Sequence, residues 1–199
     1  QNHPKLPPAE YFVKAALPEL NRSVYTFCMC PGGSVIGCSS SEGTIITNGM
    51  SNASRGGRFA NSAIVVNVRV GDFSSGLQPL GGLSFRRTWE QKAFAAGGGN
   101  YCAPAQNMPD FLEGRAGGRV GQTSFMPGVK SAVLQDVMPD FVTDALRRGI
   151  REFEKKMTGF MTGEARLIGV ETRTSSPVRI CRGKDGQSVN TRGLYPCGE

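Results

Sequence analysis

Histidine is nearly missing from this sequence. The single one, His3, lies close to the N-terminus, where residues are seldom held rigidly. Serine- and cysteine-dependent catalytic triads need a histidine as their general base. The six cysteines include no Cys-x-x-Cys pair, which is the spacing that zinc sites commonly show. The sequence therefore predicts neither a histidine-dependent catalyst nor a metal site.

Long apolar runs are missing too. No stretch approaches the ~18 residues that a membrane-spanning helix requires, and the polar, proline-broken N-terminus lacks the pattern of a secretion signal. Cysteines in such a chain are more often free thiols than disulfides. We expect a cytoplasmic protein that does not enter a membrane. Because the chain starts without an initiator methionine and ends at Cys197-Gly198-Glu199, we also expect it to be part of a longer protein.

Two nucleotide-binding signatures are absent. Gly97-Gly98-Gly99 does not form a GxGxxG pattern after a strand, and the sequence has no GxxxxGK[ST] pattern. The net charge of +7 comes from scattered basic residues, not from a basic block interleaved with aromatic residues. We therefore do not expect a nucleic-acid partner. We attribute the charge to a solvated surface that can attract an anionic small molecule.

Glycine is abundant, with 27 residues in 199, which is about twice the usual frequency. Short β-branched runs separated by turn residues predict strands, and apolar residues at helical spacing predict helices. The regular alternation of strand and helix that is typical of parallel sheets is missing. We predict an α+β fold with a mixed, largely antiparallel sheet and two or three packed helices.

The predicted strands occupy both halves of the chain. In the first half, three short runs are expected to form a meander before a stronger β-branched strand. In the second half, two strands follow the last helix. The predicted ranges are 24–28, 34–38, 44–47, 62–69, 165–172 and 178–182.

Two helices are predicted between these strands. Ser84 is expected to cap a helix over residues 85–96, which the three following glycines would end. Pro139 precedes the clearest helix, whose apolar stripe runs from Phe141 to Met157. Residues 113–124, rich in glycine and basic residues, are long enough for a mobile loop or lid, but we expect a plain disordered excursion.

The segment from Phe27 to Asn61 concentrates the candidates for substrate contact. Its Cys-x-Cys-Pro-Gly-Gly sequence predicts a sharp turn that exposes backbone amides, which can hold anions or carbonyl groups. Arg55 can grip a carboxylate with two hydrogen bonds, although polar turns are often satisfied by their own backbone. The candidate substrate-binding residues are Gly32, Gly33, Asn48, Ser51, Arg55, Asn61 and Gln106.

Cys28 and Cys30 allow three interpretations. As catalytic residues they would form a redox dithiol, although a Cys-x-Cys disulfide closes a small, strained ring. As metal ligands they lack a second pair of ligands. As packed thiols they fill space beside the predicted turn. All three alternatives stay open at this point.

Four segments together resemble one family, the uncharacterised FAD-dependent, or NAD(FAD)-utilising, dehydrogenases of bacteria. They are FCMCPGGSVIG with EGTIITNGMSNASRGGRFANSAIVV, KAFAAGGGNYCAPAQ, FVTDALRRGI, and GVETRTSSPVRI with GLYPCGE. The resemblance implies an inserted domain of a two-dinucleotide-fold flavoprotein. It divides the chain into a linker (1–20), a substrate-side domain (21–172) and a return segment into the FAD-binding part (173–199).

By the same resemblance, residues 171–180 lie near the flavin ring, where hydroxyl groups and cations can contact it. The implied flavin-binding residues are Arg173, Ser175, Ser176, Pro177 and Arg179, with Gly198 and Glu199 matching the second flavin motif. Gly56 departs from the family pattern, which often has an acidic residue there.

The resemblance thus implies a region of an FAD-dependent oxidoreductase. Hydride would pass between flavin and an unidentified substrate, for which an anion is one candidate, and NAD(P)H is a candidate electron donor. The isolated chain is expected to be inactive. Two alternatives remain: a non-catalytic domain that binds an acidic partner, and a thiol redox module that uses Cys28 and Cys30.

Overall fold

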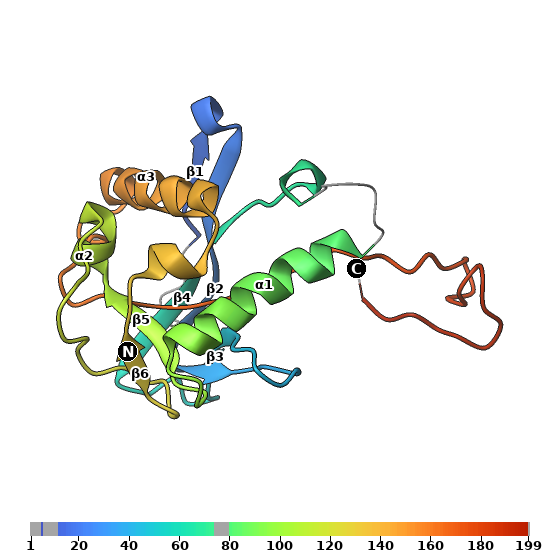
Figure 1. The fold of residues 1–199 in the computed structure, drawn as a ribbon, viewed down its shortest axis with the longest axis horizontal. Helices are drawn as coiled ribbons and strands as arrows, with labels where there is room; N and C mark the ends of the chain where they lie inside the picture. Colours follow the sequence, from blue (N-terminus) through green and yellow to red (C-terminus); the bar gives the residue numbers. More distant parts are fainter. Residues whose placement is uncertain (1–4, 6–11, 74–79, 199) are drawn as a thin grey trace.

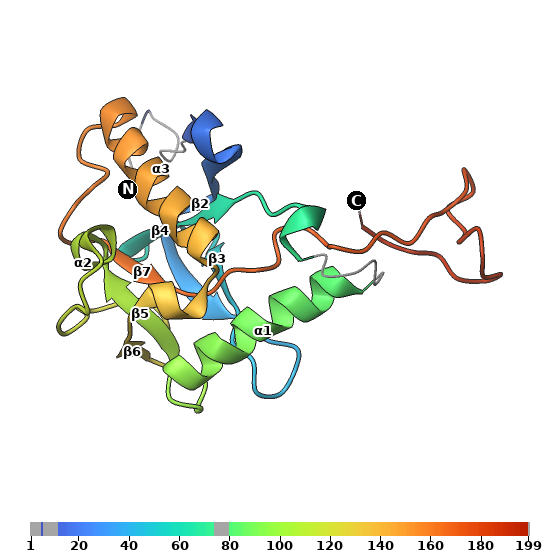
Figure 2. The ribbon, with the colours of Figure 1, turned by 45° about the horizontal axis from the view of Figure 1, so that its top comes forward.

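The computed structural model describes residue 5 and residues 12–73 and 80–198. Within these residues, two sheets lie at the centre of the molecule and three α-helices pack around them (Figure 1, Figure 2). One sheet is antiparallel, and the other mixes a parallel and an antiparallel pair. The arrangement confirms the predicted α+β fold class.

A single long strand organises the antiparallel sheet. This strand, β2, pairs with each of the other three strands of the sheet. The strands are β1 (Lys14–Leu17), β2 (Arg22–Gly37), β3 (Thr47–Ser51) and β4 (Phe59–Val66). Ala15 and Leu17 of β1 are buried, so part of the predicted N-terminal linker belongs to the sheet and its core.

The predicted sharp turn at Pro31-Gly32-Gly33 is wrong, because β2 continues through it. The strand absorbs the irregular sequence in β-bulges, which shift its register against β4 around Cys30. Cys28 and Gly32 adopt positive φ angles of 47° and 56° there. The predicted three-stranded meander is therefore one strand followed, after a loop, by β3.

The mixed sheet is smaller and has β5 (Ala103–Asn107) at its centre, flanked by β6 (Val129–Ser131) and β7 (Arg166–Ile168). The strand predicted over residues 165–172 is therefore shorter than expected. Beyond β7 the chain passes from one sheet to the other: the Gly169 amide donates to the Pro104 carbonyl, and the Thr47 amide donates to the Val170 carbonyl.

The helices are α1 (Gly81–Ala96), α2 (Met108–Glu113) and α3 (Asp140–Lys156). Pro139 directly precedes α3, as predicted. The predicted cap at Ser84 is wrong, because α1 already begins at Gly81 and the Leu80 carbonyl accepts the Ser84 amide. Among the described residues, no helix combines the length and apolar character that crossing a membrane demands.

Two hydrophobic clusters hold these elements together. The smaller one joins α3 to β1 and β2 through Phe153, Ala145 and Val24. Helix and strand approach closely there, because a Cβ atom added at Gly149 would lie 2.5 Å from the Cβ atom of Val24. The larger cluster contains Phe111, Leu134, Ile150 and other residues beneath α1 and α2.

Residues 178–198 form an arm that projects from the body beyond the N-terminal end of α1 and folds back on itself (Figure 1, Figure 2). The strand predicted over 178–182 is wrong: the arm has only an isolated bridge between Arg182 and Ser188. Ile180 and Tyr195 are 55% and 62% exposed, so the arm is not packed against the core.

Candidate functional site

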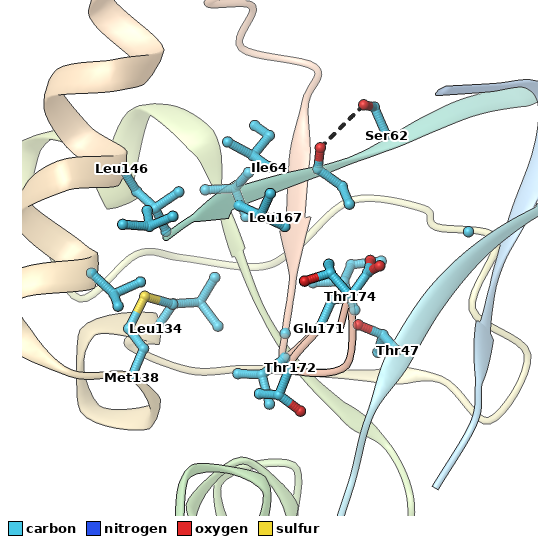
Figure 3. Close-up of a pocket in the computed structure, with 18 of the residues that line it drawn as sticks. Thr47, Ser62, Ile64, Leu134, Met138, Leu146, Leu167, Glu171, Thr172 and Thr174 are labelled. Atoms are coloured by element: carbon cyan, nitrogen blue, oxygen red, sulfur yellow. Dashed lines mark hydrogen bonds between the residues drawn. The ribbon is translucent and has the colours of Figure 1, made fainter. Parts of the chain in front are cut away.

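A cavity of about 1040 Å³ lies at the junction of the two sheets, bordered by α1 and α3. One half of it is apolar: Ile64, Leu134, Met138, Leu146 and Leu167 face one another across it (Figure 3). Several of these residues also belong to, or pack on, the larger hydrophobic cluster. The hydrophobic core itself therefore forms the apolar wall of the cavity.

The other half of the cavity carries polar groups. Figure 3 shows Thr47, Glu171 and Thr174 gathered there, with Thr172 below them. Asn48 and Asn61, two of the predicted substrate contacts, also line the cavity. A pocket of this kind, with a few polar groups set against an apolar wall, is typical of sites for small organic molecules.

The segment that carries Glu171 is fixed on both sides. Val170 accepts a hydrogen bond from the Thr47 amide of β3, with N and O 2.9 Å apart. On the other side, the Thr172 hydroxyl donates to Glu90 of α1, with the oxygens 2.7 Å apart. The backbone around Glu171 is therefore anchored to elements that are distant in the sequence.

Burial in this cavity raises the pKa of Glu171 to about 7, from an ordinary value near 4.5. Desolvation is the cause, because it disfavours the charged form of a carboxylic acid. A carboxyl group that titrates near neutral pH inside a pocket can both accept and donate a proton. Glu171 is thus the group in the cavity that is best suited to proton transfer.

A second acid, Glu90, anchors the neighbouring cations. Its side chain is almost fully buried and forms ion pairs with Arg173 at 3.3 Å and Arg86 at 3.1 Å. The contact with Arg86 is not aligned as a hydrogen bond. Arg173, predicted to face the flavin, also donates to the Ser40 hydroxyl, so its side chain is held within this cluster.

Asn61 occupies space that two glycines leave open. A Cβ atom at Gly49 would lie 2.1 Å from its Oδ1 atom, and one at Gly33 would lie 3.0 Å from its Nδ2 atom. That Nδ2 atom is buried and makes no hydrogen bond within the described part of the chain. Gly33 therefore lets a polar side chain reach across the sheet, which is a packing role.

Other predicted substrate contacts hold the loop that follows β3 against strand β2. A Cβ atom at Gly32 would lie 1.9 Å from the Arg55 carbonyl oxygen, and the Gly32 carbonyl accepts the Gly57 amide. The Ser51 hydroxyl donates to the Pro31 carbonyl at 2.9 Å. Neither Arg55 nor Ser51 lines the cavity; the structure gives these residues contacts that hold loop and strand together.

Gln106 lies in the core and away from the cavity. Its Nε2 atom donates to the Arg115 carbonyl at 2.7 Å, and its Oε1 atom accepts the Leu134 amide at 3.0 Å. Both polar ends of this buried side chain are therefore used by the backbone. The side chain ties β5 to the glycine-rich loop and to the 3-10 turn Leu134–Val137.

Cys28 and Cys30 are free thiols in the bulged part of β2. The Cys30 thiol donates to the Cys28 carbonyl, with S and O 3.4 Å apart, and burial raises its pKa. A protonated thiol is a poor nucleophile, which weakens the redox interpretation. Within the described residues, no group of three or more histidine, cysteine or acidic side chains could hold a metal ion.

Apart from Arg173, the residues predicted to contact flavin fall into two sets. Ser175, Ser176 and Pro177 line the cavity and are exposed, so they lie where it opens to solvent, which we call its mouth. Pro177 is held against α1, because a Cβ atom at Gly82 would lie 2.7 Å from the Pro177 Cβ atom.

The other set lies on the arm. Arg179 is exposed there, and the Gly198 carbonyl accepts a hydrogen bond from Arg182 at 3.0 Å. Glu199 lies outside the described residues. The structure therefore does not bring Arg179 or Gly198 to the cavity.

The sequence did not single out Glu171, Thr47 or Glu90 as individual site residues. Glu171 carries a signal, because it follows the apolar run Leu167–Val170 directly and so enters the interior with it. Glu90 carries none, since it lies among polar neighbours in a helix and its burial depends on packing with distant segments.

Taken together, these observations define an α+β domain with a cavity at the junction of its two sheets. Residues 1–174 match the family described as FAD-dependent protein, C-terminal domain-like, and the chain belongs to this family. An uncharacterized protein from Clostridium beijerinckii is 46% identical over 200 residues, which cover 100% of this chain. The chain spans 37% of that protein's length, so the remainder of such a protein lies outside this domain.

Proposed function

We propose that this chain is the substrate-side region of an FAD-dependent oxidoreductase, in which the cavity holds an organic substrate next to the flavin. The position of residues 174–177 carries the proposal. This segment lines the cavity mouth, and it is the segment that the sequence resemblance assigns to the flavin. Membership of an FAD-dependent family supports the same assignment.

The residues at the mouth fit one edge of a flat aromatic group. Phe73, Phe85 and Trp89 line this end of the cavity, with successive ring centroids 5.9 and 6.2 Å apart. Such rings offer an apolar face for stacking. Ser175 adds a hydroxyl group to the lining, whereas the Ser176 hydroxyl donates to the Val178 carbonyl and accepts the Val178 amide. The sequence has no dinucleotide fingerprint, so we infer that other parts of a longer protein bind the rest of FAD.

When bound, the flavin would supply two-electron hydride exchange. The residues of this chain would then bind and orient the substrate. The apolar half of the cavity would exclude water from the substrate body, while the polar half would fix its functional group. Glu171 could hold or move a proton at its carboxylate. We also propose NAD(P)H as the electron donor. Residues 173–199 would form the return segment toward the FAD-binding part.

An acidic macromolecular partner is less well supported. Three arginines of α3 are engaged within the domain: Arg147 donates to the Phe111 carbonyl and Arg151 to the Leu112 carbonyl, while Arg148 pairs with Asp144. A helix face whose cations bind the molecule's own carbonyl and carboxylate groups has fewer free cations for a partner.

A bulky residue at the cavity mouth would test the flavin assignment. We expect Ser175→Trp in the full-length protein to weaken FAD binding by about tenfold or more, because the indole would fill the space given to the ring. Ser41→Trp is the matched control, since Ser41 is also exposed but does not line the cavity. FAD affinity would be measured by titrating the FAD-free protein and following flavin fluorescence.

Two results would contradict the proposal. One is a full-length protein that is colourless when purified and binds no added FAD. The other is equal FAD affinity in the Ser175→Trp and Ser41→Trp variants.

A further inference from the structure

We propose that the substrate has an apolar body and a polar end that donates hydrogen bonds, an alcohol or an amine, and that this end contacts the Glu171 carboxylate. The inference rests on the proposed function, because it names the substrate class for the same cavity. It differs from the anionic substrate that the sequence analysis named as one candidate.

The position of Glu171 is the first argument. Its carboxyl group lies between Thr47 and Thr174 in the polar half, across from Leu134 and Leu167 (Figure 3). A ligand whose body rests on the apolar half therefore directs its other end toward Glu171. The cavity volume, about 1040 Å³, is at the upper end of the range of roughly 300–1,000 Å³ for organic ligands.

The second argument is the charge around this carboxylate. Arg173 does not line the cavity, and Arg86, which does, is paired with Glu90. The Cys30 and Cys38 thiols, whose pKa values are raised by burial and also by Glu171, carry no positive charge. Glu164 and Arg166 also line the cavity, and Arg166 donates to the Gly163 and Ala165 carbonyls. Like charges that meet in a partly desolvated site repel strongly, so an anionic end next to Glu171 is disfavoured.

The third argument is that Glu171 can accept the proton that the substrate releases when it is oxidised. When an alcohol or amine is oxidised, its O–H or N–H proton passes to the Glu171 carboxylate. A bound flavin would supply the two-electron acceptor for the hydrogen on the adjacent carbon, which would leave as hydride while a C=O or C=N bond forms. In the reverse direction the Glu171 carboxyl group returns the proton.

Binding of a cationic end should therefore depend on pH. The carboxylate attracts a cation only when it is ionised, and burial raises the pKa of Glu171 to about 7. Affinity for a protonated amine should increase from pH 6 to pH 8, whereas affinity for an anionic ligand should not increase.

The test uses the intact protein and two probes of equal chain length, octylamine and octanoate, in isothermal titration calorimetry. At pH 8 we expect octylamine to bind about tenfold more tightly than octanoate. Glu171→Gln should abolish this preference, and the preference should shrink at pH 6. Glu42→Gln is the control, because Glu42 is exposed and does not line the cavity, and it should keep the preference.

Equal or tighter binding of octanoate, an unchanged preference in Glu171→Gln, or no binding of either probe would overturn the inference. The titrations are run on both FAD-loaded and FAD-free protein. A protein that prefers octylamine but never binds FAD would contradict the proposed function alone. A protein that binds FAD without the amine preference would contradict this inference alone.

Discussion

The two halves of the cavity are built in different ways. The apolar half is made of residues such as Leu134, Ile150 and Leu146 that belong to, or pack on, the hydrophobic core. The polar half depends on individual contacts: the Thr47 amide on Val170, and Asn61 over Gly49. Substitutions in the apolar half should therefore change the stability of the whole domain, whereas substitutions in the polar half should change local geometry and ionisation.

The largest effect is expected in the apolar half. Ile150 is 1% exposed and lines the cavity, so Ile150→Ala should lower the free energy of unfolding by about 2–4 kcal/mol, because it removes buried methyl groups and enlarges the void. Ile150→Val, which removes less, should cost about 0.5–1.5 kcal/mol. Urea unfolding of the 199-residue chain measures both; a loss below 1 kcal/mol for the alanine variant would show that this half is not part of the core.

A smaller effect is expected where the polar half is shaped by a close approach. A Cβ atom at Gly49 would lie 2.1 Å from Asn61 Oδ1, so Gly49→Ala should displace the Asn61 side chain and cost about 1–3 kcal/mol. Gly49→Ala combined with Asn61→Gly should recover most of this loss, since the clash is then gone. The second substitution makes the experiment a double-mutant cycle.

The control for this experiment is Gly163→Ala, since nothing lies within 4 Å of a Cβ atom added there. It should change the free energy of unfolding by less than about 0.5 kcal/mol. If Gly49→Ala proved equally neutral, Asn61 would not be fixed as described.

The smallest effect on stability concerns Glu171. Its pKa in the folded state, about 7, exceeds its ordinary value of 4.5. The folded state therefore binds the proton more tightly than the unfolded state, and stability is lost as pH rises from 4.5 to 7. Glu171→Gln should remove this loss and stabilise the chain at pH 8 by no more than about 1–2 kcal/mol, because the carboxylate is partly exposed.

The same variant should have little effect below the lower end of that range, since the native carboxyl is then neutral too. Chemical unfolding at pH 4 and at pH 8 compares the two conditions. A stabilisation of equal size at both pH values would show that the burial of Glu171, and not its ionisation, decides the outcome.

The sequence predicted those parts of the fold that depend on local periodicity. Helix α3 follows from the apolar spacing between Phe141 and Met157, and the end of α1 follows from Gly97. The residues of the apolar half of the cavity could be predicted in the same way, because they are ordinary core positions.

What the sequence could not predict depends on contacts between distant segments. Pro31-Gly32-Gly33 looks like a turn, but the loop after β3 packs on Gly32 and allows the strand to continue in a bulged form. Residues 178–182 have the composition of a strand, yet in the described residues they lack a neighbouring strand to pair with. The apolar run before Glu171 indicates that the chain enters the interior there, but the partners that hold its neighbours, Thr47, Glu90 and Pro104, are distant in the sequence and no local pattern reveals them.

The most direct test of the account is a crystal structure of the full-length protein with FAD bound. The account predicts that the flavin ring borders residues 174–177 at the cavity mouth, with the Glu171 carboxyl group facing the space next to the ring. A flavin bound elsewhere, or a cavity filled by side chains from the rest of the protein, would contradict it.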